Sequence, residues 1–477
     1  MHQQAAGSAA SLKCYCRFMN SRPWTALAAA FTTLIAGAAA QADQDGLAIT
    51  IGRPGPLLNF EWPALEIGVA TYEAGPTGVT VIRFPKRAAA AVDVRGAGPG
   101  TMMTDAMRLG YNYPWLDAVV LSGGSAYGLE AVAGVASALK DDGSRSGMWG
   151  DIAGVSGAIV YDFLGHRLNE IYPDKRLGAA ALRAAKPGAF PLGAQGAGRD
   201  VMQGWFFGCG VHSGQGGAFR QIGETKIAAF VVVNASGSVT DRDGNLVKCH
   251  RGANWGTLTK TAELLAHVPE SRDRDWGPPD DDKPSRRNTT ISVVVTNREM
   301  GWAGLQRLAT QVHTSMARAI QPFSTFDDGD TLFAVSTGEV KGEKPSLIDI
   351  DTVASETMWD AILASLPQEE DFAPPATAAT VAPDLLARYV GNYSFGPNAV
   401  MTVTFTDGQL WASLSKFGFF DLRKGDKSRL TPLSETDFYI AGRYQTRISF
   451  VRDSSGQVTG AVINSGTWAQ VGTRNGG

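Results

Sequence analysis

Residues 288–296 read NTTISVVVT, an apolar strand pattern that begins directly at two adjacent threonines. The stretch before it, residues 270–288 (ESRDRDWGPPDDDKPSRRN), is charged, contains three prolines and has almost no aliphatic residue. Such a composition predicts an exposed loop of the kind that tolerates a break in the chain. The sequence therefore places an exposed loop immediately before a buried strand.

The Asn288–Thr289 bond at this junction is a candidate site of self-cleavage. The Thr289 hydroxyl can attack the preceding carbonyl, and an N-to-O acyl shift then gives an ester that water hydrolyses. The new N-terminal threonine would carry an α-amine with a pKa of about 8, which can act as a base for its own hydroxyl. A plain strand start explains the same residues, so the junction alone leaves both interpretations open.

A second candidate feature is the pair of carboxylates in Asp328-Gly329-Asp330. In extended backbone, residues two apart point to the same side, so both carboxylates can face one nucleophile and orient it. A surface Asp-Gly turn is the alternative. An EF-hand calcium loop does not fit, because the acidic residue six positions after the glycine is missing.

Composition restricts the class of protein. The 477 residues are 44% hydrophobic and 19% charged, which is ordinary for a globular protein with a large core. The formal net charge is −3, and no basic block is longer than Arg286-Arg287. This charge pattern argues against nucleic acid as a partner.

Residues 1–42 have the pattern of a signal peptide. The basic residues Lys13, Arg17 and Arg22 precede an apolar run at 24–40, and small residues follow at 38–42. We therefore expect a periplasmic or secreted protein without a membrane span after signal removal. A retained membrane anchor is the alternative, although the run is shorter than the roughly 20 residues that a span needs.

Two cysteines, Cys209 and Cys249, remain after the predicted signal. An oxidising compartment permits a disulfide between them, and two buried free thiols are the other possibility. Their spacing does not match a zinc site.

The remaining sequence divides into a large and a small part. Residues 46–365 combine predicted buried strands, such as 116–121 and 228–234, with a predicted helix at 128–139. A proline- and alanine-rich linker is predicted at 366–383. Residues 384–477 alternate in the manner of strands, which predicts a small all-β, barrel-like domain.

Several motifs in the large part occur in the order found in a known family. The chain resembles the L-aminopeptidase/D-esterase family, which includes β-peptidyl aminopeptidases and nylon-oligomer hydrolases and is classified as peptidase family S58. The resemblance is carried by residues 94–101 (VRGAGPGT), 120–129 (VLSGGSAYGL), 231–237 (VVVNASG), 288–291 (NTTI) and 328–333 (DGDTLF).

The resemblance implies an α+β fold, an αββα sandwich of the self-processing N-terminal-nucleophile type. Its two fragments would be residues 43–288 and 289–365, separated at Asn288–Thr289. Thr289 would be the nucleophile, oriented by Asp328 and Asp330. The Asn234 amide would donate to the oxyanion, and Tyr161 would line the site.

The resemblance also implies the function. We expect a self-cleaving amide hydrolase that releases N-terminal residues from small peptides, amides or esters through an acyl-enzyme on Thr289. The family uses no metal or organic cofactor, and its processed protomers assemble as homo-oligomers. The alternatives are an endo-acting hydrolase of linear amide oligomers, an amino-acid acyltransferase of related fold, and a non-catalytic binding protein.

One departure from the family pattern concerns the nylon-oligomer hydrolases. They carry a lysine after a Gly-Ala-Gly stretch, whereas this chain has Gly204 or Trp205 at that place. Arg199 is the nearest alternative cation. In the small part, residues 386–393 (LARYVGNY) and 407–410 (DGQL) resemble the β domain appended to some penicillin-binding-type serine hydrolases.

Overall fold

The computed structural model describes residues 44–476 with internal gaps, and these residues belong to one compact unit, residues 41–477. The gaps are residues 109, 112–114, 145–147, 149, 164–165, 209, 250–259, 267–287, 343, 368–373, 416–417 and 443. The predicted signal peptide and nearly all of the predicted loop at 270–288 therefore lie outside the described residues.

A ten-stranded mixed sheet forms the frame of the large part. Its main path runs β11-β12-β14-β16-β4-β6-β7-β5, with β3 on β4 and β1 on β3. The strands are β1 (Ile49–Ile51), β3 (Glu66–Tyr72), β4 (Thr77–Val94), β5 (Thr101–Met102), β6 (Trp115–Ser122), β7 (Val155–Ile159), β11 (Gln215–Ile222), β12 (Thr225–Asn234), β14 (Thr289–Arg298) and β16 (Thr331–Val340).

The long strand β4 joins two layers of this sheet. Its first half pairs with β3 and β6, and its second half pairs with β16. The layers face each other across one apolar core, to which β3, β4, β6, β12, β14 and β16 all contribute side chains. The sheet is therefore folded on itself as a sandwich.

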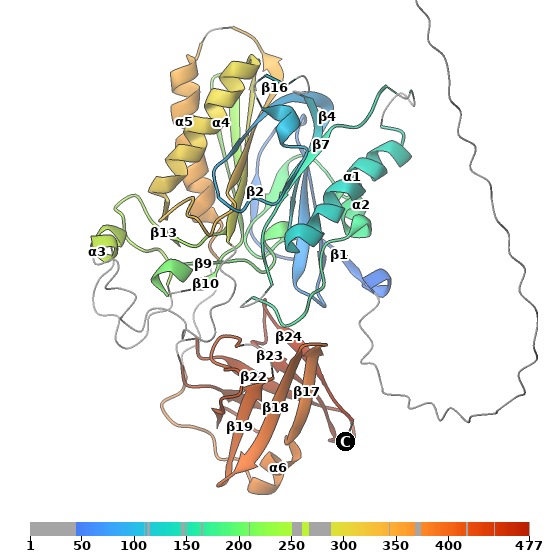
Figure 1. The fold of residues 1–477 in the computed structure, drawn as a ribbon, viewed down its shortest axis with the longest axis vertical. Coiled ribbons are helices and arrows are strands. Elements are labelled where there is room, and N and C mark those ends of the chain that lie inside the picture. Colours follow the sequence, from blue (N-terminus) through green and yellow to red (C-terminus); the bar gives the residue numbers. More distant parts are fainter. Residues whose placement is uncertain are drawn as a thin grey trace, which may run out of the picture. The chain divides into compact units, whose positions relative to one another are not determined.

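Two pairs of helices cover the outer faces of the sandwich. Helices α1 (Leu129–Asp141) and α2 (Lys175–Arg183) pack on β3, β4 and β6, whereas α4 (Trp302–Ser315) and α5 (Leu347–Ala364) pack on β12, β14 and β16. Figure 1 shows the two pairs on opposite sides of the strands. This is the αββα architecture expected from the sequence, and the expectation is confirmed.

Strand β14 shows how the sequence specifies a strand that is covered on both faces. All ten of its residues are buried. Ile291, Val293 and Val295 face the core between the two layers, whereas Val294 faces α4 and α5. Because successive side chains of a strand point to opposite faces, a strand covered on both sides needs a continuous apolar run.

Shorter elements connect the layers. They are β2 (Leu57–Asn59) with β8 (Ala189–Pro191), β9 (Met202–Gln203) with β10 (Val211–His212), β13 (Ser238–Val239) with β15 (Ile320–Gln321), and helix α3 (Thr261–Ala266). Single 3-10 turns lie at Gln44–Gly46, Asp105–Met107, Ser125–Gly128, Gly196–Gly198, Trp205–Phe207 and Met316–Arg318.

The C-terminal part is a separate closed barrel of eight antiparallel strands, preceded by the short helix α6 (Pro383–Arg388). The strands are β17 (Gly391–Gly396), β18 (Ala399–Thr406), β19 (Gln409–Leu414), β20 (Ser428–Pro432), β21 (Asp437–Tyr439), β22 (Arg447–Arg452), β23 (Val458–Ile463) and β24 (Gln470–Arg474). Stacked aromatic rings, such as Tyr389 on Phe450, fill its interior. Closure leaves no free strand edge.

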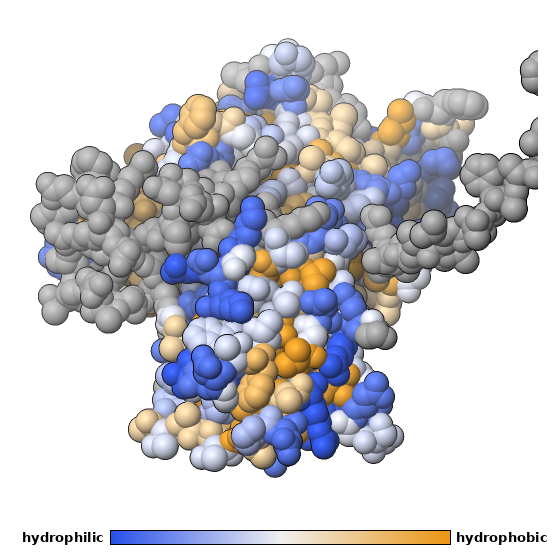
Figure 2. All heavy atoms as spheres, turned by 60° about the horizontal axis from the view of Figure 1, so that its bottom comes forward, coloured by the Kyte–Doolittle hydropathy of each residue, from blue (hydrophilic) through white to orange (hydrophobic). Residues whose placement is uncertain are grey.

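Two surface observations complete the fold. Figure 2 shows orange, apolar side chains gathered among blue, hydrophilic ones on the face that it turns forward. The large apolar side chains most exposed on the barrel are Val390, Val451 and Val471. Among the described helices, none combines the length and the apolar character that crossing a bilayer requires.

Candidate active site

Three strands bring the predicted site residues to one end of the sheet. Thr289 is the first residue of β14 and pairs with Asn234, the last residue of β12. Strand β16 runs parallel to β14 and begins at Thr331, directly after Asp330. Because parallel strands begin at the same edge, the Asp-Gly-Asp turn lies beside Thr289.

The carbonyl oxygen of Asn288 accepts two hydrogen bonds. The Thr289 hydroxyl donates to it at 2.5 Å, and the backbone N–H of Gly329 donates at 2.8 Å. Asn288 and Thr289 are only 4% and 3% exposed, so both bonds lie inside the protein. The hydroxyl is thus held against the carbonyl of the predicted scissile bond, and a backbone donor polarises that carbonyl.

Asp330 is fully buried, and its carboxyl binds the backbone at Thr290 and at Ser324. Its Oδ1 accepts the N–H of Thr290 at 2.6 Å, and its Oδ2 accepts the N–H and hydroxyl of Ser324 at 3.0 and 3.1 Å. Burial, helped by the nearby charge of Asp328, raises the pKa of Asp330 to about 8. The folded site therefore favours the protonated form of this carboxyl.

Asp328 fixes a different pair of segments. Its Oδ1 accepts the N–H of Ser236 at 3.1 Å, and its Oδ2 accepts the N–H and hydroxyl of Thr325 at 2.9 and 2.6 Å. Burial raises the pKa of Asp328 as well. The two carboxylates lie close together, as the sequence predicted, but their hydrogen bonds position the backbone around Thr289.

The side chain of Asn234 is completely buried and held at both ends. Its Nδ2 donates to the carbonyl of Tyr161 at 2.8 Å, and its Oδ1 accepts the N–H of Met202 at 3.2 Å. A primary amide carries two N–H groups, so one remains beyond the bond to Tyr161. Asn234 thus lies beside Thr289 with its amide plane fixed.

Tyr161 reaches the site through its backbone. Its carbonyl oxygen, rather than its phenol, makes the bond to Asn234. Its ring packs edge to face on Phe163, with centroids 5.7 Å apart. The sequence pattern located the residue, whereas the contacting group follows only from the path of the chain after β7.

Glycines that the sequence reasoning left without a role allow the close approach of these segments. A Cβ on Gly96 would lie 2.2 Å from the backbone nitrogen of Asp330, and one on Gly329 would lie 2.9 Å from the Thr289 hydroxyl. The 94–101 motif therefore packs directly under the Asp-Gly-Asp turn. Ser236, Ser324, Thr325 and the Gly329 N–H were also missed, since their contacts depend on tertiary structure.

The structure also bears on Arg199, on the two cysteines and on metal binding. Arg199 is buried and paired with Glu73 at 2.9 Å, so the structure places this cation in an ion pair. Cys249 is disulfide-bonded, and Cys209 lies outside the described residues. Within the described part of the chain, no group of three or more His, Cys, Asp and Glu side chains is arranged to hold a metal ion.

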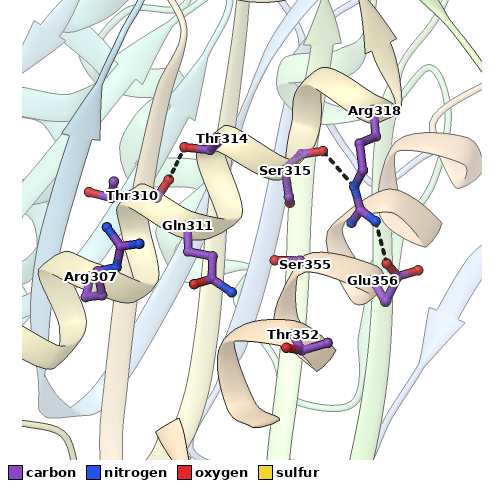
Figure 3. A pocket seen from close by; sticks show the side chains of 9 residues that line it. All are labelled: Arg307, Thr310, Gln311, Thr314, Ser315, Arg318, Thr352, Ser355 and Glu356. Carbon is purple, nitrogen blue, oxygen red and sulfur yellow. Dashed lines mark hydrogen bonds and ion pairs between the residues drawn. The ribbon is translucent and has the colours of Figure 1, made fainter. Parts of the chain in front are cut away.

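A polar groove between α4 and α5 lies apart from this site, and none of its residues belongs to it. It is lined by Arg307, Thr310, Gln311, Thr314, Ser315, Arg318, Thr352, Ser355 and Glu356. Figure 3 shows Arg318, in the 3-10 turn that follows α4, beside Glu356 on α5, with which it forms an ion pair 2.9 Å long. We assign the groove no part in the chemistry.

Comparison with known proteins decides the family. The profile of peptidase family S58 matches residues 63–373, more than half of the chain. This protein belongs to peptidase family S58. The recognition made from the sequence is thereby confirmed, and membership places the chain among the peptidases and amide hydrolases.

Relatives of this S58 protein include two groups with different names. A 6-aminohexanoate-oligomer endohydrolase of Paenarthrobacter ureafaciens is 40% identical over 326 residues, covering 64% of this chain and 85% of the relative. An uncharacterised aminopeptidase of Mycobacterium leprae is 31% identical over 337 residues, covering 66% and 89%. Among solved structures, a β-aminopeptidase of Burkholderia sp. matches with a TM-score of 0.46 and 19% identity, covering 68% and 90%.

The barrel matches a different profile. Residues 375–472 correspond to a domain of unknown function, DUF3471. Its resemblance to the appended domain of serine hydrolases stays a prediction.

The raised pKa of Asp330 predicts how the stability of the intact S58 chain depends on pH. The unfolded carboxyl loses its proton near pH 3.9 and the folded one near pH 8, so the folded state binds the extra proton between these values. The free energy of unfolding should therefore fall as pH rises from about 4 to about 8. Denaturant titrations of Thr289→Ala, which lacks the hydroxyl needed for the predicted cleavage, measure this slope. In the double variant Thr289→Ala/Asp330→Asn, the contribution of Asp330 to the slope should disappear. Equal slopes in the single and double variants would contradict the raised pKa of Asp330.

Proposed function

We propose that this protein is a self-cleaving amide hydrolase whose nucleophile is Thr289, freed by cleavage of the Asn288–Thr289 bond. The observation that carries the proposal is the double hydrogen bond to the Asn288 carbonyl oxygen, from the Thr289 hydroxyl and the Gly329 N–H. One donor belongs to the attacking group and the other lies where negative charge develops on the oxygen during attack.

Cleavage follows from this geometry in two steps. The Thr289 oxygen attacks the Asn288 carbonyl carbon, and the C–N bond of the peptide breaks as the nitrogen takes up a proton. The resulting ester joins Asn288 to the threonine oxygen. Water then hydrolyses the ester, which leaves a carboxylate on Asn288 and a free amine and hydroxyl on Thr289.

The mature site uses the same threonine. The α-amine accepts the hydroxyl proton while the oxygen attacks the carbonyl carbon of the substrate amide. The remaining N–H of Asn234 donates to the oxyanion, the amine product leaves, and water releases the acyl group from Thr289. Asp328 and Asp330 hold the backbone that carries these groups.

Two substrate classes fit this chemistry. Release of N-terminal residues from small peptides, amides or esters is the first candidate, as expected from the sequence. The second candidate, internal cleavage of linear amide oligomers, is favoured by the higher identity to the 6-aminohexanoate-oligomer endohydrolase, 40% against 31% for the mycobacterial aminopeptidase. Export after loss of residues 1–42, and assembly of processed protomers as a homo-oligomer, complete the proposal.

Replacement of the nucleophile tests the proposal directly. Intact mass of Thr289→Ala should show one uncut chain across positions 288 and 289, and amide hydrolysis should fall by at least roughly 10³-fold. Thr289→Ser keeps a hydroxyl and should still process. A wild-type chain that stays uncut yet hydrolyses amides would refute the nucleophile assignment.

The close approach of Gly329 to the Thr289 hydroxyl should matter for processing. A Cβ at position 329 would come within 2.5 Å of the Gly98 carbonyl oxygen and 2.9 Å of the Thr289 hydroxyl, so Gly329→Ala displaces the attacking oxygen. We expect the rate of cleavage to fall about 10²-fold. The matched control is Gly98→Ala, whose Cβ meets nothing closer than 3.9 Å. Time courses on denaturing gels measure both, and equal rates would remove the role of the Gly329 contact.

Product analysis separates the substrate classes. The processed enzyme is incubated with a linear 6-aminohexanoate oligomer and with a short peptide amide, each with a free or an acetylated N-terminus. An exo-acting enzyme should require the free amine and release one residue at a time, whereas internal cleavage should tolerate acetylation. Product that appears only on an added amine acceptor would instead indicate acyl transfer.

A further inference from the structure

The two groups that hold the Asn234 amide come from different segments of the large part. Met202 in β9 donates to the amide oxygen, and the Tyr161 carbonyl, just after β7, accepts from the amide nitrogen. The direction of the remaining N–H of Asn234 is therefore set by the relative position of these two segments. Each segment also contacts the C-terminal barrel.

The Met202 segment contacts the barrel through His212. Strand β10 pairs with β9 so that His212 lies opposite Met202. The His212 Nε2 lies 3.1 Å from Oδ1 of the fully buried Asp200, which ties the ring to the same segment. On its other side, the ring stacks on Trp468 of the barrel, with centroids 4.1 Å apart and planes 11° apart.

The Tyr161 segment contacts the barrel through Leu168. A completely buried ion pair, 3.0 Å long, joins Arg167, the residue before Leu168, to Asp162, the residue after Tyr161. The N–H of Leu168 donates to Oε1 of Gln470 at 3.2 Å. The Leu168 side chain packs in the apolar core of the barrel itself.

Trp468 and Gln470 lie two residues apart, where the turn after β23 enters β24. A single turn of the barrel therefore touches both segments that hold Asn234. We propose that the C-terminal barrel positions the Asn234 amide for catalysis, with Trp468 and Gln470 as the positioning residues. This inference rests on the proposed role of Asn234 as an oxyanion donor, and it assigns a task to a domain of unknown function.

We expect a change in the barrel to affect turnover of substrates and self-cleavage differently. The carbonyl of the proposed scissile bond, that of Asn288, accepts its backbone hydrogen bond from Gly329. Gly329 is not one of the two groups through which the barrel is connected to the Asn234 amide. Loosening the barrel contact should therefore change the oxyanion donor for external substrates and leave self-cleavage intact. Since substrate binding does not depend on the oxyanion, kcat should respond more than KM.

The test is Trp468→Ala in the full-length chain. Intact mass should show normal cleavage at 288–289, while kcat for a short peptide amide falls about 10-fold and KM stays within about twofold. Trp468→Phe keeps a ring to stack on His212 and should restore most of kcat. The matched control is Trp411→Ala on β19, where Trp411 alternates with the core-facing Leu410 and Ala412; its kcat should stay at the wild-type value.

Gln470→Leu provides a second variant that keeps the volume but loses the bond to Leu168, and it should show the same split if Trp468→Ala does not fold. A processed Trp468→Ala enzyme with kcat within twofold of wild type would overturn the inference. Equal losses for Trp468→Ala and Trp411→Ala would also overturn it, because the barrel would then act only through general stability. Failure of the wild-type chain to process or to cleave amides is a different result, which refutes the proposed function instead.

Discussion

The carbonyl oxygen of Asn288 accepts hydrogen bonds from the Thr289 hydroxyl and the Gly329 N–H, and strand pairing places both of these residues. Strand β14 begins at Thr289, and β16 begins two residues after Gly329 in parallel register. The peptide group before β14 and the turn before β16 are therefore adjacent by construction. A change in either register would separate the Thr289 hydroxyl, the Asn288 carbonyl and the Gly329 N–H from one another.

Burying the carboxyl groups of Asp328 and Asp330 costs free energy of desolvation. Desolvation disfavours the charged forms and raises the pKa of both carboxyl groups, and the charge of Asp328 raises the pKa of Asp330 further. The cost is offset by hydrogen bonds, since each carboxyl accepts one side-chain hydroxyl and two backbone N–H groups. These bonds reach into three separate segments, so the two carboxyls order the backbone of the whole site.

The sequence was a good guide where local pattern determines structure. The continuous apolar runs at 228–234 and 291–296 became β12 and β14, because strands covered on both faces need no polar side. The motif order brought Thr289, Asn234 and the Asp-Gly-Asp turn to one place. The backbone donor Gly329 and the carbonyl of Tyr161 could not be read in this way, since every residue carries these groups and only the fold selects them.

Long-range contacts between the two parts were beyond any sequence pattern for the same reason. His212 and Trp468 stack across 256 positions, and neither residue stands in a motif.

The raised pKa of Asp330 also has a consequence for the proposed cleavage. Freeing the α-amine of Thr289 places a basic nitrogen one residue from the Thr290 N–H that Asp330 binds. An ammonium there favours the ionised carboxylate, so cleavage would lower the pKa of Asp330. The product is then held by an attraction that the intact chain lacks.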